Sequence, residues 1–76
     1  MSALPRISER EAVAAFCKLG YEIDRQRGSH IILRHPQPTN RRLTVPDHRE
    51  VAKGTLRALI REAGITVDEF ASLLRK

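Results

Sequence analysis

The chain has 76 residues, enough for one modest core, so we expect residues 1–76 to form a single domain. Hydrophobic residues make up 41% and charged residues 30%, which argues against a disordered protein, and no apolar run approaches the roughly 18 residues that cross a bilayer. The net charge is +5 and eleven of the 14 basic residues are arginine, whose planar donors grip phosphate, so the composition favours a polyanionic partner.

The first predicted element is a helix over residues 8–19. Ser8 and Glu11 have the spacing of a capping box, in which each side chain bonds the backbone amide of the other. Apolar residues then recur at helical spacing, and Gly20 is expected to end the helix. Cys17 belongs to the apolar pattern, so we expect it to be buried. As the one cysteine of the chain, it can form no internal disulfide and no cysteine metal site.

Three strands are predicted next, at residues 21–26, 29–35 and 41–45. Each alternates apolar and polar residues, and prolines interrupt the chain between the second and third. The apolar residues suffice for one face of the sheet, so the other face should stay open to solvent. The residues expected to face the helices are Tyr21, Ile23, Ile31, Leu33, Leu43 and Val45. Those expected on the open face are Glu22, Asp24, His30, Ile32, Arg34, Arg42 and Thr44.

The connection between the first two strands decides which residue lies opposite His30. We expect a three-residue loop at 26–28, with Gly28 in the left-handed conformation. This register pairs Asp24 with His30, where a carboxylate could orient the imidazole, although a solvated surface pair is the alternative. Alternation along the first strand places Arg25 on the helix-facing side. A two-residue loop is disfavoured, because it would pair Ile31 with Asp24 and so put an isoleucine on the polar face.

Two further helices are predicted, over residues 53–63 and 66–74. Gly64 should close the first of them. The second begins with a capping box at Thr66 and Glu69, flanked by a hydrophobic staple. The order is therefore α-β-β-β-α-α, an α+β fold in which a three-stranded antiparallel sheet carries helices on one face.

The basic side chains suggest where phosphate would bind. Arg34 and Arg42 share the open face with His30, and we expect Arg34 to reach the same phosphodiester as His30. Lys53 and Arg57 begin a basic stripe on the first of the two later helices. This stripe is either a solvated helix face or a track for RNA phosphates, with free backbone amides at the start of the helix.

The three histidines differ in their expected roles. His30 lies on the polar face, so core packing does not explain it. His35 points to the opposite side and is expected to be a loop residue, which makes the two poor joint metal ligands. His48 could cap or orient the following helix, or serve as a second proton carrier. We expect no metal site and no cofactor.

Four blocks of residues then match a known family in order. These blocks are Leu19-Gly20-Tyr21, Gly28-Ser29-His30, Val45-Pro46-Asp47-His48 and Gly54-Thr55-Leu56-Arg57. Together they make the chain resemble the HicA-type toxins from about Ser8 to Gly64. These toxins are small mRNA-cleaving ribonucleases of bacterial toxin–antitoxin pairs.

The resemblance implies a double-stranded-RNA-binding-like fold and a HicB-type antitoxin that covers the active face. It makes His30 the catalytic histidine, with Gly28 and Ser29 in its motif. The chain departs from the family at Leu33, where an aromatic residue is common, and in the added charge within residues 38–42. Either departure could alter RNA preference.

The chemistry that the resemblance implies needs few protein groups. RNA carries its own nucleophile, the 2′-hydroxyl, and a neutral imidazole can remove its proton at cytoplasmic pH, where arginines would stabilise the phosphorane. Residues 1–6 lead into no apolar secretion segment, so we expect a cytoplasmic location. Two alternatives are a non-catalytic RNA-binding module of the same fold and an interaction domain for an acidic protein. Neither alternative depends on the imidazole of His30.

Overall fold

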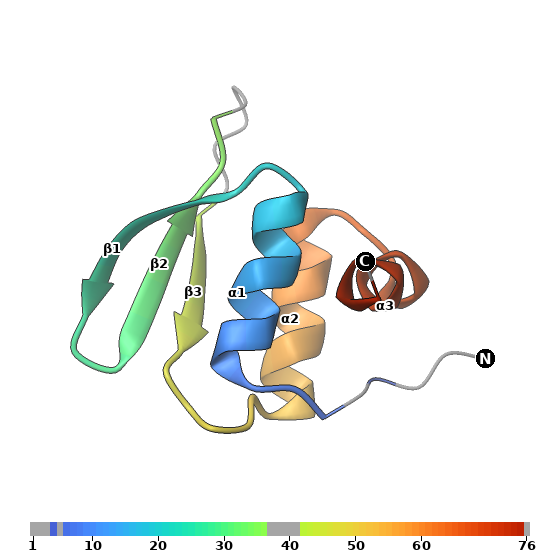
Figure 1. Ribbon diagram of the computed structural model, residues 1–76, viewed down its shortest axis with the longest axis horizontal. Helices are drawn as coiled ribbons and strands as arrows, with labels where there is room; N and C mark the ends of the chain where they lie inside the picture. The colour runs from blue at the N-terminus through green and yellow to red at the C-terminus, as the bar shows by residue number, and fades with distance from the viewer. Residues whose placement is uncertain (1–3, 5, 37–41, 76) are drawn as a thin grey trace.

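The computed structural model describes residue 4 and residues 6–36 and 42–75. Its elements are α1 (Glu9–Lys18), β1 (Glu22–Arg27), β2 (His30–Arg34), β3 (Leu43–Pro46), α2 (Lys53–Ala63) and α3 (Val67–Leu74). The strands form one antiparallel sheet in the order β1-β2-β3, with the helices on one side of it (Figure 1). The predicted α+β class and element order are therefore confirmed. No helix within the described ranges is long and apolar enough to cross a membrane.

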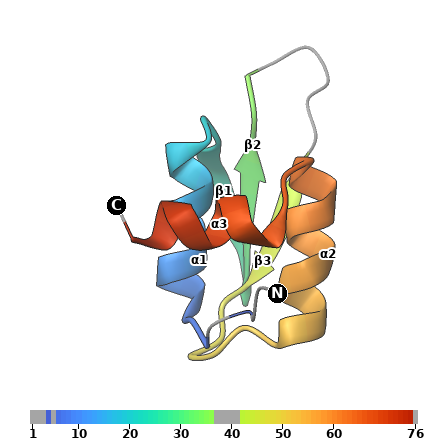
Figure 2. The same cartoon turned by 90° about the vertical axis from the view of Figure 1, so that its right-hand side faces the viewer.

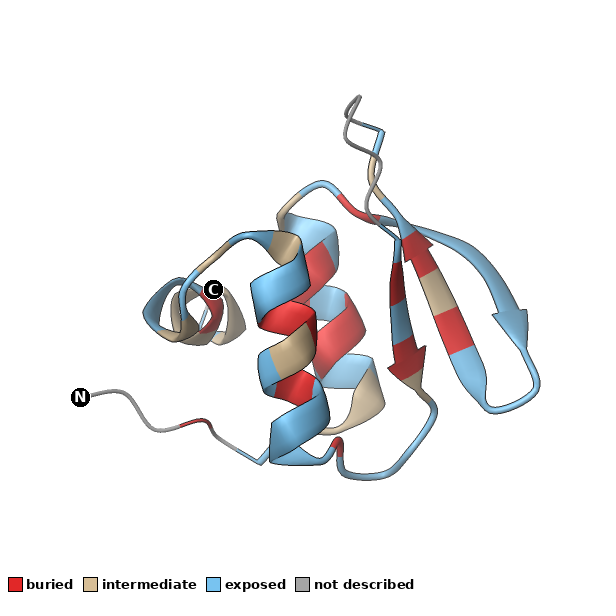
Figure 3. Ribbon diagram, turned by 180° about the vertical axis from the view of Figure 1, so that it is seen from behind, coloured by how far each residue is buried: buried red, intermediate tan, exposed pale blue. Residues whose placement is uncertain are grey.

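The two faces of β2 and β3 differ as predicted. Ile31 and Leu33 of β2 and Leu43 and Val45 of β3 are buried, whereas the residues between them are exposed or half-buried (Figure 3). Figure 2 shows α1 and α2 side by side over the same face of the sheet, with α3 lying across both helices. Alternation with period two therefore gives one face to the core and leaves the other open to solvent.

Aromatic rings hold α3 to the rest of the core. Phe16 of α1 lies 5.1 Å from Phe70 of α3 and 6.1 Å from Tyr21, measured between ring centroids. Both phenylalanines are fully buried. At the helix surface, Lys18 Nζ donates a 2.8 Å hydrogen bond to the backbone carbonyl of Leu73, which supplies a donor to the carboxyl end of α3.

The predicted helix boundaries are confirmed at their caps. Ser8 with Glu11, and Thr66 with Glu69, form capping boxes in which both reciprocal hydrogen bonds are present. Gly64 ends α2 in the left-handed conformation. The residue before α2 is Ala52, and no side chain caps the helix, so of the roles considered for His48 the capping of α2 is not observed.

Strand β1 departs from the prediction because it is exposed along its whole length. Ile23 was expected in the core, yet 60% of its surface is exposed. It pairs with buried Leu33, which places it on the helix side of the sheet. Helices α1 and α2 contact β3, at the opposite edge of the sheet, and leave β1 uncovered (Figure 1), so lying on the helix side does not bury Ile23.

The β1–β2 connection also differs from the prediction. Arg27 pairs with His30, so the turn consists of two residues, Gly28 and Ser29. Gly28 does adopt the left-handed conformation expected of it, with φ 56°. The predicted pairing of Asp24 with His30 is wrong.

The shorter turn is accompanied by a register shift between Ile23 and Arg25. Such a bulge inserts one extra residue into a strand and reverses the phase of the alternation beyond it. Arg25 consequently pairs with Ile32 and joins the open face rather than the helix-facing one. Ile31, the isoleucine that a short loop was expected to put on the polar face, instead pairs with Gln26 and is buried.

Cys17 is exposed, contrary to the prediction that it would be buried. It follows Phe16, which is fully buried in the core, and one step along a helix turns the next side chain by about 100°. The atoms around its sulfur still desolvate the thiolate, which raises the pKa of Cys17, and the negative charge of Glu22 raises it further.

Candidate active site

His30 lies on the open face at the end of the sheet where the β1–β2 turn is found. It is exposed, with Arg27 of β1 opposite it on one side and Pro46 of β3 on the other. Directly opposed residues in an antiparallel pair have Cβ atoms about 5 Å apart. The structure thus sets an arginine beside the candidate catalytic imidazole.

Sequence reasoning missed Arg27 because it assigned this residue to the loop. The turn glycine was the available signal, since two-residue turns also favour a left-handed glycine. Counting the turn as Gly28 and Ser29 would have placed Arg27 opposite His30.

Arg25 adds a second guanidinium to the open face. It is exposed and pairs with Ile32, which in turn pairs with Thr44 of β3. Asp24 lies next to it, with its carboxylate 3.7 Å from Arg25 Nε. The acid that was expected to orient His30 therefore contacts an arginine of its own strand.

Arg34 lies at the opposite end of β2 from His30. At about 3.3 Å per residue the two side chains are separated by about 13 Å along the strand. The expectation that both reach one phosphodiester is therefore wrong. Arg42 follows the β2–β3 register to a position beside Arg34, and both are exposed, so the two arginines form a separate basic pair.

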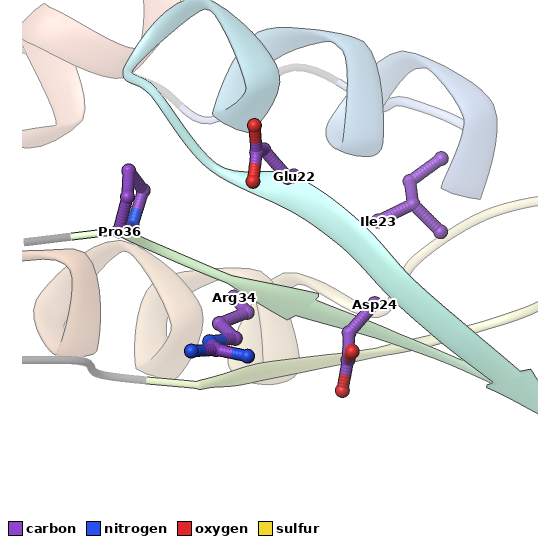
Figure 4. Close-up of a pocket in the computed structure, with 5 residues that line it drawn as sticks. All are labelled: Glu22, Ile23, Asp24, Arg34 and Pro36. Atoms are coloured by element: carbon purple, nitrogen blue, oxygen red, sulfur yellow. The ribbon is translucent and has the colours of Figure 1, made fainter.

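A shallow hollow of about 250 Å³ lies between Arg34 and the first residues of β1. Figure 4 shows Asp24 and Arg34 on one side of β1 and Ile23 on the other, nearer α1. The residues that line the hollow are Glu22, Ile23, Asp24, Arg34 and Pro36. Acidic and basic groups are both present, so the hollow itself has no single charge preference.

The turn that carries His30 is fixed to the end of β3 by Asp47. The amide of Asp47 donates a 2.6 Å hydrogen bond to the carbonyl of Ser29. Its carboxylate accepts a 3.3 Å bond from Gln26 Nε2 on β1. These bonds join all three strands at the end of the sheet where His30 lies, which restricts the motion of the imidazole-bearing backbone.

His48 is exposed in the connection between β3 and α2. Its carbonyl accepts a 3.2 Å hydrogen bond from the amide of Glu9, so it contacts the start of α1 rather than capping α2. Because it follows Asp47 directly, it lies at the same end of the molecule as His30. Its position at this end of the molecule allows His48 to act as an auxiliary proton carrier, but does not require it to take part in the reaction.

The basic residues of α2 belong to the helix layer. Lys53 and Arg57 are exposed, as are Gly54 and Thr55 between them. The start of α2 and the β1–β2 turn lie at the same end of the molecule (Figure 1). The structure thus separates these residues from the open face while leaving Lys53 nearer than Arg57 to that end.

His35 has a structural environment. Its Nε2 lies 3.1 Å from the carbonyl oxygen of Leu19, and its ring meets Tyr21 edge-on at 4.8 Å. It follows β2 outside the strand, as expected of a loop residue, but it is half-buried. These contacts hold the end of α1 to the end of β2.

Among the described residues, no group of three or more His, Cys, Asp or Glu side chains is arranged to hold a metal ion. The polar groups that the sheet gathers around His30 are instead arginines. Exposed guanidinium groups beside an imidazole are suited to a phosphodiester, since they bind its oxygens while the imidazole exchanges a proton.

The chain matches the profile of a known family. The profile described as HicA toxin of bacterial toxin-antitoxin matches residues 10–65, which include the whole sheet, α1 apart from its first residue, and α2. A search of curated proteins gives no significant match. The match covers well over half of the chain and contains His30, Arg27, Asp47 and the start of α2. The chain therefore belongs to the HicA toxin family of bacterial toxin–antitoxin systems, a membership that implies an antitoxin partner.

Proposed function

We propose that this toxin is a metal-independent endoribonuclease that cleaves mRNA in the cytoplasm, with residues 1–76 acting as a single domain and His30 as its general acid/base. The observation that carries the proposal is the exposed imidazole of His30 directly opposite Arg27 on an otherwise uncovered sheet face. Family membership supports the same conclusion. We further propose that a HicB-type antitoxin inhibits the enzyme by covering this face.

The reaction is a transfer within the RNA itself. His30 removes the proton of a 2′-hydroxyl, and the 2′-oxygen attacks the adjacent phosphorus. The bond from phosphorus to the 5′-oxygen breaks, and that oxygen takes a proton from solvent or a second carrier such as His48. The products are a 2′,3′-cyclic phosphate and a 5′-hydroxyl. Arg27 stabilises the charge that builds up on the phosphoryl oxygens.

The remaining basic groups would bind neighbouring phosphates. Gly28 has no side chain and Ser29 has a small one, which lets RNA approach the turn beside His30. Further along the open face, Arg34 and Arg42 would contact the strand away from the cleaved bond. In the helix layer, Lys53 and Arg57 would add affinity through charge.

Replacing His30 with glutamine tests the proposal. Because His30 is exposed, His30→Gln should fold normally and slow RNA cleavage by at least about 100-fold, the lower range for lost acid–base catalysis. The matched control is His35→Gln, which should lower the melting temperature while cleaving at the normal rate below it. Folded His30→Gln protein that cleaves as fast as the unsubstituted toxin would overturn the assignment.

Two further readouts separate catalysis from simple binding. Cleavage should persist in EDTA and spare DNA, and a single 2′-deoxy substitution at the cleaved bond should block it. In cells, expression without an antitoxin should arrest growth, and His30→Gln should relieve the arrest. Tight RNA binding with no cleavage product under any of these conditions would favour the RNA-binding module instead.

A further inference from the structure

The outer edge of β1 is unpaired in this chain, because β1 forms one border of the sheet. All six of its residues are exposed. Ile23 is the one large apolar residue reported as exposed within the described part of the chain. An edge strand presents free backbone amides and carbonyls, which form a template for another strand.

The charges of β1 complement those of the same strand reversed. The strand reads Glu22, Ile23, Asp24, Arg25, Gln26 and Arg27. An antiparallel pair with a two-fold axis between Asp24 and Arg25 places Glu22 opposite Arg27 of the second copy. It also places Asp24 opposite Arg25 of that copy, so each charged residue meets one of opposite sign. Opposite charges across strands stabilise pairing.

The two faces of the sheet also match in this register. Arg25 and Arg27 lie on the open face, because they pair with Ile32 and His30. Glu22 pairs with exposed Arg34. By their pairing, Glu22, Arg25 and Arg27 belong to the open face, whereas Asp24 is the bulged residue between Ile23 and Arg25.

The uncharged residues of β1 occupy the other face. Ile23 and Gln26 pair with buried Leu33 and Ile31 of β2, so both lie on the helix side of the sheet. In the two-fold register they oppose each other across the axis. Neither the Glu22–Arg27 pair nor the Ile23–Gln26 pair joins residues from opposite faces.

Neighbouring registers are unfavourable. A shift by one residue in one direction sets Asp24 against its own copy, and a shift in the other direction sets Arg25 against its own copy. Like charges directly opposed destabilise a strand pair, and a one-residue slip also opposes residues from different faces. The charges on this edge thus disfavour the two registers next to the proposed one.

We propose that β1 pairs antiparallel with β1 of a second copy of this chain, forming one six-stranded sheet across a two-fold axis. A pair of short strands buries far less than the roughly 1,200–2,000 Å² of a stable interface, so the dimer should be weak and concentration-dependent. The bulges at Asp24 of the two copies meet near the axis, which limits backbone hydrogen bonding to the two ends of the strand pair. The open faces of both copies would then lie side by side.

Sedimentation equilibrium at low salt tests the pairing, because exposed charge pairs are screened as salt rises. Glu22→Arg sets an arginine opposite Arg27 of the second copy at both ends of the strand pair. It should weaken self-association about tenfold. The double variant Glu22→Arg/Arg27→Glu restores opposite charges and should restore the dimer. The control is Glu50→Arg, which makes the same charge change at an exposed residue after β3 and should leave association unchanged.

Cysteine cross-linking tests the register. In a Cys17→Ser background, Ile23→Cys/Gln26→Cys should form dimers on oxidation, since the thiol at position 23 lies opposite the thiol at position 26 of the second copy. Within one chain these positions lie about 10 Å apart along the strand, too far for a disulfide. The single variant Ile23→Cys should cross-link poorly. A monomer at every concentration, a charge swap that fails to restore association, or equal cross-linking by the single variant would overturn the proposal.

Discussion

Gly20 joins α1 to β1 with a backbone φ of 105°, a conformation that favours glycine. A Cβ atom there would lie 2.9 Å from Nε2 of His35, whose ring is held by its other contacts. We expect Gly20→Ala to reduce the free energy of unfolding by about 2–3 kcal/mol, measured by urea denaturation.

Two other glycines provide the controls. Gly28 has φ 56° but open space around it, so Gly28→Ala should lose only the backbone contribution of about 1 kcal/mol. Gly54 has open space and ordinary helical geometry, so Gly54→Ala should be neutral or stabilising by about 0.5 kcal/mol. A Gly20→Ala protein as stable as Gly28→Ala would contradict the proposed clash with His35.

The thiol of Cys17 offers a second prediction at the residue scale. Desolvation and the charge of Glu22 raise the pKa of Cys17, so less reactive thiolate is present near pH 8 than for a free cysteine. Iodoacetamide should therefore alkylate it slowly, with a rate that rises as pH approaches the raised pKa. Glu22→Gln should lower the pKa and speed alkylation at fixed pH. A rate that is equal in both proteins would show that Glu22 has no influence.

At the scale of elements, α3 lies outside the family match yet contributes to the core. Its fully buried Phe70 packs on Phe16 of α1. We expect Phe70→Ala to reduce the free energy of unfolding by about 3–5 kcal/mol, a large part of the stability of a small domain. Urea denaturation gives the measurement.

The control within α3 is Asp68→Ala, which removes an exposed side chain from the same helix and should have an effect below about 1 kcal/mol. Lys18→Met should also destabilise slightly, because it removes the bond to Leu73. If Phe70→Ala unfolds at the same urea concentration as Asp68→Ala, then α3 does not contribute to the stability of the core.

At the scale of the whole molecule, the basic groups fall into distinct layers. Arg27 lies beside His30 on the open face, whereas Arg57 lies on α2 in the helix layer. Under single-turnover conditions, Arg57→Ala should weaken RNA affinity and leave the saturated cleavage rate unchanged. Arg27→Ala should lower the saturated rate by about 10- to 100-fold, because it removes charge from the transition state.

Salt dependence supplies a second measurement for the same pair. Losing one phosphate contact should reduce the slope of log affinity against log salt by about 0.7 for single-stranded RNA. Both variants should show this change if both arginines bind phosphate. A large fall in saturated rate for Arg57→Ala, with affinity unchanged, would place the active site in the helix layer and refute the open-face assignment.

The sequence by itself determined the elements and the core of β2, β3 and the helices. Capping boxes, terminal glycines and apolar spacing depend on neighbouring residues, so local chemistry was sufficient to predict them. The same reasoning placed His30 on a polar face, because alternation within one strand needs no partner. The sequence also carried the family resemblance that the profile match confirms.

Only the tertiary structure decided what surrounds His30 and which side chains the helices cover. A bulge at Asp24 and a two-residue turn shift the register of β1, which brings Arg25 and Arg27 to the open face and removes Asp24 from His30. Ile23 stays exposed because the helices pack near β3 and leave β1 uncovered. Register and coverage depend on contacts between distant segments, and alternation along one strand carries no information about either.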